Sequence, residues 1–176
     1  MNSGTCAATP GRRALRVAGW LLIFLLVFEV VAIVLFRTRW QPGIQGVRRF
    51  NRRFLNPVMM RFAGKGRWYA SVVHHEGRKS GKAYTTPIWA VAAGRHFYIP
   101  LPYGRDVDWC RNILHAGRCV LESHGTRYEA TSPEIVDADL AAGQIPLRDH
   151  LRFSTYGVDA YLRLEVPPAQ ITEMSA

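Results

Sequence analysis

Acidic residues are almost missing from the first third of this 176-residue chain. Residues 1–67 contain a single acid, Glu29, against 12 lysines and arginines. Residues 68–176 contain 11 basic and 12 acidic residues, so the formal net charge of +10 belongs entirely to the N-terminal third. The larger part of the chain has no net positive charge and no recognition motif for nucleic acid, which disfavours a nucleic-acid-binding function.

Cysteine and metal-binding motifs are also scarce. Cys6, Cys110 and Cys119 form no C-x-x-C pair, and such an odd, widely spaced set is typical of a reducing compartment. The six histidines form no H-E-x-x-H motif, and the adjacent His74 and His75 are expected on opposite faces of a strand. We therefore predict no metal site. The chain also lacks the G-x-S-x-G and G-x-G-x-x-G motifs of hydrolase nucleophiles and dinucleotide-binding turns.

A long apolar run is present instead, over Val17–Phe36, and it predicts a transmembrane helix. A helix of 20 residues spans roughly 30 Å, which is the hydrocarbon thickness of a bilayer. Its 15 Leu, Ile, Phe and Val residues contribute about −7 kcal/mol to insertion, against about +3 kcal/mol for the one charge. Glu29 therefore does not prevent insertion, and we expect it to be paired or to reach the headgroups rather than to be catalytic.

A cleaved signal peptide is the alternative, because Arg12 and Arg13 precede the run. The run is longer than a signal-peptide core, however, and no Ala-x-Ala site follows it, so an uncleaved anchor is favoured. N-terminal sequencing distinguishes the two, since a mature start near residue 40 would contradict the anchor. Six arginines follow the run within 20 residues and three precede it. This asymmetry predicts a single-pass protein of the cell membrane with a cytoplasmic soluble domain.

An amphipathic helix is predicted after the span, over Ile44–Phe62. Its apolar residues recur every three or four positions and its arginines share another face: Val47, Phe50, Phe54, Val58 and Phe62, with Arg48, Arg49, Arg52 and Arg53. Pro57 is expected to break or kink this helix, with Asn56 as the cap of a new segment. Two compatible roles stay open. The helix lies on anionic lipid headgroups, or it packs its apolar face on the soluble domain.

The remaining two thirds predict a small, mainly β (α+β) domain. Six strand candidates are rich in β-branched and aromatic residues: Tyr69–Glu76, Tyr84–Ala92, His96–Pro100, Arg118–Ser123, Arg127–Val136 and Tyr161–Val166. Pro87 indicates that the second of them is an edge strand or is bulged. A helix is expected over Val107–Ala116, capped by Asp106 or Asp108 and ended by Gly117, with a short helical piece over Asp137–Ala142. These elements predict a closed or partly open barrel.

The chain thus divides into five segments, and we find no internal repeat. They are an N-terminal tail (1–16), the transmembrane helix (17–36), a basic juxtamembrane helical segment (37–66), the barrel (67–167) and a C-terminal tail (168–176). Only the barrel is long enough to bury a core of its own.

The turn Gly77–Lys82 carries the densest cluster of binding chemistry in the barrel. It is not a Walker A loop, because three residues separate its glycines and Ala83 follows the lysine. It still offers backbone N–H groups, two or three cations and a hydroxyl, which together suit a phosphate or a carboxylate. An ordinary exposed basic hairpin is the open alternative.

Three motifs carry a resemblance to a known family. Gly77-Arg78-Lys79-Ser80-Gly81 is followed closely by Thr85-Thr86-Pro87, and Asp108-Trp109-Cys110-Arg111-Asn112 comes later; Phe50-Asn51-Arg52 precedes them. This pattern resembles the deazaflavin-dependent nitroreductase family, whose members are split β-barrels related to pyridoxamine phosphate oxidase. The resemblance covers about residues 50–136. The chain has Tyr84 where the family usually has an arginine, and Arg105, in a second divergent stretch, is a candidate to replace the missing cation.

The resemblance implies a six-stranded split barrel that binds coenzyme F-420, an 8-hydroxy-5-deazaflavin, with FMN as the second choice. By this resemblance, the residues that meet the cofactor are Arg78, Lys79 and Ser80 at its phosphate, Thr85, Thr86 and Pro87 beside its ring system, and Trp109 and Asn112 of the later motif. The implied reaction is hydride transfer to an acceptor stacked on the ring. Tyr103 and Tyr156 are candidate proton donors, because each lies in a glycine-bearing loop segment.

A membrane-held enzyme of this kind suits lipophilic acceptors, so a quinone-like or nitroaromatic acceptor is expected. Split barrels of this family often dimerise, so a homodimer is compatible with the resemblance. Two other functions stay open: a barrel that holds a deazaflavin, flavin or haem without turnover, and an anchored structural or interaction domain. Changing both Arg78 and Lys79 to Ala distinguishes the structural or interaction domain from the other two functions. The double change should abolish cofactor affinity in a cofactor-binding protein and have no effect on a structural domain.

Overall fold

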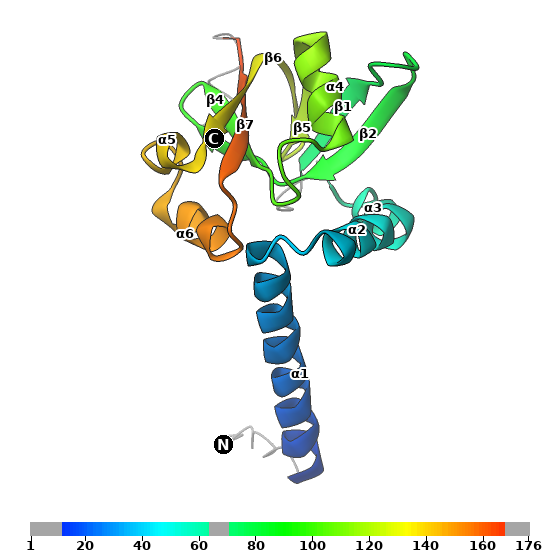
Figure 1. Ribbon diagram of the computed structural model, residues 1–176, viewed down its shortest axis with the longest axis vertical. Helices are drawn as coiled ribbons and strands as arrows, with labels where there is room; N and C mark the ends of the chain where they lie inside the picture. The colour runs from blue at the N-terminus through cyan, green and yellow to red at the C-terminus, as the bar shows by residue number, and fades with distance from the viewer. Residues whose placement is uncertain (1–11, 64–70, 168–176) are drawn as a thin grey trace, which may run out of the picture.

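Seven strands form one antiparallel sheet that curls into an open half-barrel (Figure 1). The computed structural model describes residues 12–63 and 71–167. The strands are β1 (Ser71–Glu76), β2 (Ala83–Ile88), β3 (Val91–Ala93), β4 (His96–Pro100), β5 (Arg118–Ser123), β6 (Thr126–Asp137) and β7 (Ala160–Glu165). Their order in the sheet is β2-β1-β5-β6-β7-β4-β3, so β2 and β3 are its two edges. The fold is mainly β with several helices, as expected.

The expected number of strands, six, is wrong, because the predicted strand Tyr84–Ala92 divides into β2 and β3. The first part pairs with β1 and the second pairs with β4, at opposite edges of the sheet. Trp89 and Ala90 carry the chain from one edge to the other. A period-two pattern does not reveal that the pairing partner changes, so the sequence shows one strand where the fold needs two. Pro87 lies on an edge strand, as predicted, where its missing N–H costs no ladder hydrogen bond.

β6 is the longest strand, and it bends the sheet. Its first half pairs with β5 and its second half pairs with β7, with a register shift between Thr131 and Glu134. Ser132 within this shift has a positive φ of 51°. Such a bulge increases the local twist and allows one strand to serve both halves of the curled sheet. Strands β1–β2, β3–β4 and β5–β6 pair antiparallel as hairpins. Tyr69 and Ala70, at the start of the first expected strand, lie outside the described residues.

Helix α4 (Asp108–Ala116) packs on the inner face of the sheet and completes the core. Its Cys110 and Ile113 are fully buried with Val73, Leu121 and Leu162. The helix ends at Gly117, which has the left-handed φ of 70°, as predicted. The predicted cap is wrong, since Val107 occupies the N-cap position and no side chain bonds the first turn. The Asp108 carboxylate is instead paired with Arg78.

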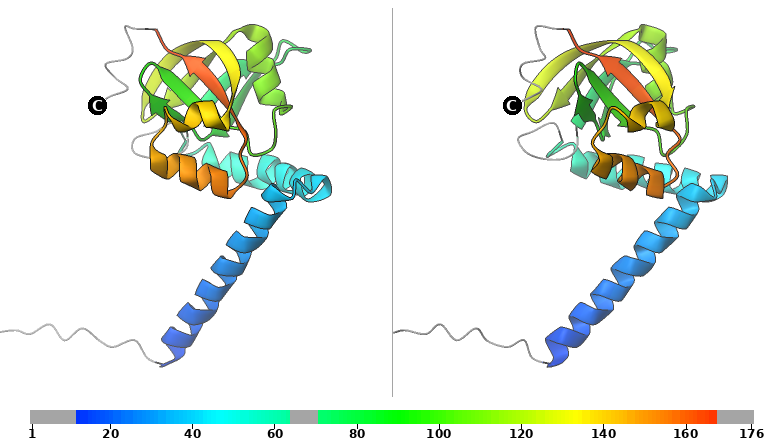
Figure 2. Two further views of the ribbon diagram at one scale, coloured as in Figure 1. Left: turned by 60° about the vertical axis from the view of Figure 1, so that its left-hand side comes forward. Right: turned by 90° about the vertical axis from the view of Figure 1, so that its left-hand side faces the viewer.

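Two further helices connect β6 to β7. The short α5 (Ala138–Ala142) confirms the helical piece expected there, whereas α6 (Leu147–Thr155) was not predicted. Helix α6 buries Phe153 against Tyr161 and Trp89 and lies at the base of the half-barrel (Figure 2).

Helix α1 (Arg12–Arg37) projects from that base as one straight rod (Figures 1 and 2). Among the described residues, its segment Leu15–Arg37 is the one helix long and apolar enough to cross a membrane, by length and composition. With 26 residues it is about 39 Å long. None of the residues in its most apolar window is buried by the rest of the described chain.

The juxtamembrane segment is one bent helical stretch running across the end of α1. It consists of α2 (Gln41–Phe50), a π-helical turn η1 (Asn51–Leu55) and α3 (Asn56–Met59). At Pro57, where a break or a kink is expected, the helix does not break but contains a π-helical turn just before the proline, and Leu55 rather than Asn56 occupies the N-cap of α3. The Asn56 N–H donates to the Asn51 carbonyl five residues earlier, and this wider turn lets the helix continue where proline supplies no donor.

Only part of the apolar side of this segment is covered by the barrel. Ile44 is buried, and Met59 and Met60 pack against Val72 of β1. In contrast, the four residues that define the predicted stripe beyond Val47 are exposed: Phe50, Phe54, Val58 and Phe62. The apolar face therefore packs on the soluble domain in part, and the four stripe residues stay exposed.

Candidate functional site

A cavity of about 580 Å³ opens between the juxtamembrane helix, the β1–β2 turn and the start of α4. Of the eight cofactor-binding residues expected from the sequence, the structure gathers seven in its walls: Arg78, Lys79, Ser80, Thr85, Thr86, Trp109 and Asn112. Pro87, the eighth, pairs with Val72 further along the edge strand and does not line the cavity. Residues 78–86 and 109–112, which are separate segments of the chain, thus meet at one site.

The Arg78 guanidinium is already bonded to protein groups in the cavity wall and is not a free cation. Its Nη1 donates to Asn112 Oδ1 at 2.9 Å, and its backbone N–H donates to the same oxygen at 3.2 Å. Its Nη2 donates to Asp108 Oδ1 at 3.1 Å. The Arg78 side chain is only 20% exposed, whereas that of Asp108 is 75% exposed. The β1–β2 turn is therefore fixed to helix α4 by a charge-assisted pair and two bonds to one amide oxygen.

The hydrogen bonds continue from Asn112 to His75 and assign the histidine tautomer. Asn112 Oδ1 already accepts from Arg78, so its Nδ2 is the donor to His75 Nδ1, 3.2 Å away. His75 Nε2 then carries the proton and donates to Thr86 Oγ1 at 3.2 Å. Burial lowers the pKa of His75, with a smaller contribution from His74 beside it. A neutral imidazole is the state that both bonds require.

The backbone of the β1–β2 turn is already hydrogen-bonded within the protein. The N–H groups of Ser80 and Gly81 donate to the Gly77 carbonyl, and the Gly77 N–H donates to the Lys82 carbonyl. The Arg78 N–H is bonded to Asn112. The expectation that this turn offers its backbone N–H groups to an anion is therefore wrong for these four groups, and anion binding here depends on side chains.

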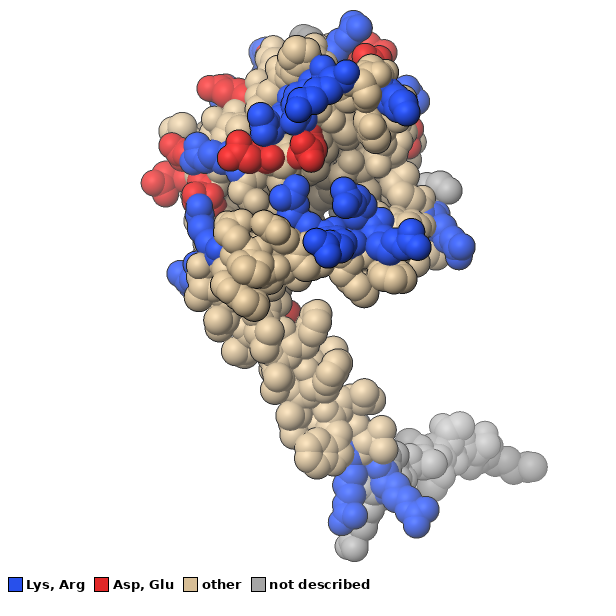
Figure 3. Space-filling view, turned by 45° about the vertical axis from the view of Figure 1, so that its right-hand side comes forward, with Lys and Arg blue, Asp and Glu red and all other residues tan. Residues whose placement is uncertain are grey.

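The cations available to a ligand come from two segments. Lys79 extends from the turn, and Arg48 and Arg52 extend from α2 and η1 on the opposite side of the cavity. All three are exposed, and no carboxylate among the described residues pairs with them within 4.0 Å. Figure 3 shows basic side chains gathered around the hollow between the barrel and the juxtamembrane helix. In the sequence both arginines belong to the basic face of an amphipathic helix, and nothing in that pattern indicates that they line a cavity.

Arg105 does not replace the arginine that the family usually has at the position of Tyr84. Its Nη2 pairs with Asp137 Oδ1 at 2.5 Å, and it is absent from the cavity walls. Tyr84 itself lines the cavity and stacks on the His75 ring, with ring centroids 5.8 Å apart and an interplanar angle of 21°. The position therefore contributes an aromatic surface and a phenol where the family pattern has a cation.

Tyr103 and Tyr156, the two candidate proton donors, lie at the junction between α1 and the barrel. Tyr103 accepts a hydrogen bond from Asn51 Nδ2 at 2.7 Å and packs against Phe36, and burial raises its pKa. The Tyr156 hydroxyl donates to the Glu29 carboxylate. Neither tyrosine lines the cavity that contains Arg78. Glu29 is paired, as the sequence predicted.

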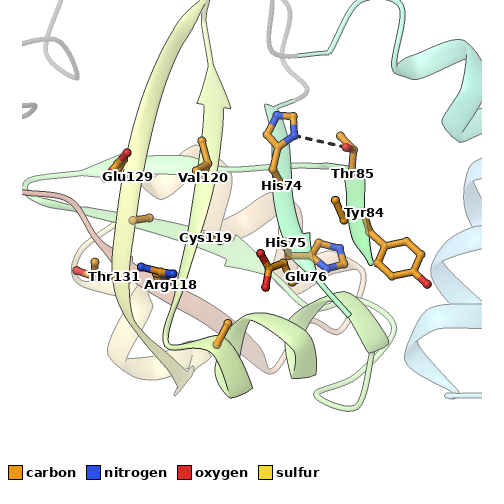
Figure 4. A pocket seen from close by; sticks show the side chains of 13 residues that line it. His74, His75, Glu76, Tyr84, Thr85, Arg118, Cys119, Val120, Glu129 and Thr131 are labelled. Carbon is orange, nitrogen blue, oxygen red and sulfur yellow. Dashed lines mark hydrogen bonds between the residues drawn. The ribbon is translucent and has the colours of Figure 1, made fainter. Parts of the chain in front are cut away.

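A second cavity, of about 400 Å³, lies beside the first and shares three residues with it. His75, Tyr84 and Thr85 line both, and the second continues over β5 and β6 to Arg118 and Glu129 (Figure 4). His74 lines this cavity, where its Nδ1 lies 3.4 Å from Thr85 Oγ1. His74 Nε2 also lies 3.1 Å from Glu122 Oε1, and Glu122 is not part of the cavity wall. The first cavity holds the larger number of free cations.

Comparison with known proteins finds similar folds among solved structures. No protein-family model and no curated protein matches the chain. The chain is similar to a domain-swapped dimer (16% identity over 69% of this chain and 98% of the other; TM-score 0.44). It is similar to an F-420-H2-dependent reductase (14% identity; 55% and 94% covered; TM-score 0.39). It is also similar to a protein named for 5-nitroimidazole antibiotic resistance from Bacteroides thetaiotaomicron (10% identity; 65% and 79% covered; TM-score 0.40). At such low similarity, the chemistry of the cavity must follow from its own residues.

Proposed function

We propose that this chain is a membrane-anchored oxidoreductase that binds coenzyme F-420 in the cavity between α2–η1 and the β1–β2 turn. One observation carries the proposal: the fold gathers seven residues of the deazaflavin-type motifs around a single cavity of about 580 Å³. This volume lies within the range of roughly 300–1,000 Å³ that is typical of small-molecule sites.

The residues of this cavity fit a ligand with a flat ring system and an anionic tail. Val107, Trp109 and Tyr84 provide apolar and aromatic surface for the ring system. Lys79, Arg48 and Arg52 provide the charge for a phosphate and carboxylates. Asn112 and Thr86 keep Arg78 and His75 in place, so the polar wall is preorganised before any ligand binds.

When bound and reduced, the cofactor supplies a hydride, so the protein needs neither a nucleophile nor a metal for this chemistry. The protein binds the cofactor and the acceptor, orients them toward each other and excludes water from the site. Tyr84 is the phenol that lines the cavity, and we propose it as the group that holds a proton near the acceptor, in place of Tyr103 and Tyr156.

A lipophilic acceptor is proposed because the helical segment that follows α1 supplies one wall of the cavity. The same segment that supplies Arg48 and Arg52 begins four residues after α1 ends. With α1 as the membrane span, a quinone-like or nitroaromatic compound dissolved in the bilayer reaches this cavity without crossing bulk water. A cytoplasmic position of the barrel and a homodimer belong to the same proposal, on the charge asymmetry and the family resemblance respectively.

The alternative is a protein that binds a deazaflavin, flavin or haem without turnover. Binding and turnover are separated by titrating the full chain, in lipid nanodiscs, with F-420, FMN and haem, and then by supplying a quinone to the loaded protein. We expect tight binding of F-420 alone and oxidation of reduced F-420 when the quinone is added. Tight FMN binding without F-420 binding would overturn the assignment of the cofactor, and binding without oxidation would leave a binding protein.

A further inference from the structure

The outer side of the juxtamembrane helix is apolar and is not covered by the described part of the chain. Phe50, Phe54 and Val58 follow one another at intervals of four residues, and each is more than half exposed. The rings of Phe50 and Phe54 lie against each other, with centroids 5.4 Å apart. These side chains therefore form one continuous strip along α2, η1 and α3. Arg49 and Arg53 border the same strip.

Helix α6 carries a second apolar surface of the same kind, more than 80 residues further along the chain. Leu147 is 69% exposed and Leu151 is 55% exposed, and their spacing of four places them on one face. Asp149 and Phe153 are buried on the opposite face, toward the barrel. The two leucines therefore point away from the barrel, at the base where α6 lies (Figure 2).

Both apolar surfaces are held at the level where α1 leaves the barrel. Figure 1 shows α6 on one side of the end of α1 and α2–α3 on the other. Arg39 pairs with Asp159 at 2.6 Å, just beyond the end of α1. The Tyr156 hydroxyl, which follows α6 directly, reaches Glu29. Glu29 lies eight residues, or about 12 Å, before the end of α1.

We propose that α6 and the α2–α3 segment together form a platform that rests on the surface of the lipid bilayer, on both sides of α1. Three features favour lipid over a protein partner. The platform is continuous with the apolar helix α1, arginines border its apolar strip as required for anionic headgroups, and Tyr156 occupies the interfacial depth that tyrosine prefers.

The platform fixes how the barrel stands on the membrane. One helix in the bilayer leaves the attached domain free to tilt, whereas contacts on both sides of that helix restrict the tilt. Because Arg48 and Arg52 lie on the same helical segment as the lipid-facing strip, the cavity mouth is held next to the headgroups. The platform rests on the proposed membrane span α1 and needs no cofactor, so absence of F-420 binding or turnover leaves it unchanged.

Site-directed spin labelling of the full chain in nanodiscs tests the platform. Single cysteines are introduced as Phe54→Cys, Leu147→Cys and Leu151→Cys in a Cys6→Ser background, where the remaining Cys110 and Cys119 are buried. Leu140→Cys is the matched control, because Leu140 is an equally exposed leucine on α5, above α6 (Figure 1). The nanodiscs contain phosphatidylcholine with a minor fraction of phosphatidylglycerol.

We expect nitroxides at 54, 147 and 151 to collide several-fold more with oxygen, relative to a water-soluble nickel complex, than a nitroxide at 140 does. The two leucine positions on α6 report independently, so one perturbed variant does not decide the result. Nickel accessibility at 147 and 151 equal to that at 140 would overturn the proposal. Protection from both reagents would also overturn it, because a protein partner would then cover the platform.

Discussion

Asn112 is the residue on which the polar wall of the cavity depends. It is 6% exposed, and it bonds Arg78 through its oxygen and His75 through its nitrogen. We predict that Asn112→Ala lowers the free energy of unfolding by about 1–3 kcal/mol, because Arg78 and His75 each lose a hydrogen bond to the buried Asn112 amide. The thermal midpoint of the full chain in detergent measures this. Arg111→Ala, an exposed neighbour on α4, is the control, and an equal shift in both variants would contradict the role of Asn112.

His75 makes the stability of the protein depend on pH. Burial lowers its pKa below the usual 6.5, so the unfolded chain takes up a proton before the folded one does. The stability is therefore complete above about pH 6.5 and falls as the pH drops toward the folded pKa, with a slope of up to about 1.4 kcal/mol per pH unit. His75→Gln is expected to reduce this decline. Identical pH profiles of the thermal midpoint for both proteins would show that His75 does not contribute.

At the scale of elements, the turn after α6 approaches the end of α1 at Gly157. Its φ is +70°, and a Cβ there would lie 3.4 Å from Arg37 Cα at the end of α1. Gly157→Ala is expected to destabilise the protein by about 1–2 kcal/mol, because L-residues pay a steric penalty in the left-handed region. Gly143→Ala is the matched control, since Gly143 has open space and a helical φ of −79°. Equal thermal midpoints for the two variants would contradict the left-handed conformation at Gly157.

Local signals in the sequence were sufficient for elements that depend on neighbours along the chain. Helix α4 with its end at Gly117 and the edge position of Pro87 both follow from turn residues and periodicity. The separate strand β3 and helix α6 could not be predicted from these local signals. β3 exists because the chain changes pairing partner within an unbroken β-like stretch. α6 has few apolar residues, and its Phe153 is buried by β7 and by Trp89, far away in the sequence.

The candidate site divides in the same way. The turn Gly77–Lys82 and its threonines were found because they are a compact motif, and the fold brings Trp109 and Asn112 to them. Arg48 and Arg52 were missed as cavity residues because only the path of the chain after α1 brings α2 and η1 back beside the barrel. Tyr103 and Tyr156 were chosen as loop tyrosines, and the sequence contains no signal that α1 ends against them.

At the scale of the whole molecule, the excess basic residues lie in two regions. Some of them flank α1, and others lie on the juxtamembrane helix beside the cavity (Figure 3). The arginines after α1 predict a cytoplasmic barrel. In sealed cytoplasmic-side-out vesicles, added trypsin is expected to degrade the barrel, whereas in vesicles of the opposite orientation the barrel is protected until detergent is added. Protection in the cytoplasmic-side-out vesicles alone would contradict this topology.

The affinity of the full chain for coenzyme F-420 is the most direct test of the proposed cofactor site. Lys79→Ala and Arg52→Ala each remove one free cation, from opposite sides of the cavity. We predict that each weakens binding by about tenfold, equivalent to about 1.4 kcal/mol. Arg95→Ala, which removes an arginine paired with Glu165 and absent from the cavity walls, should leave the affinity unchanged. Equal affinity of all four proteins, or no binding by the wild-type chain, would contradict the assignment of this cavity.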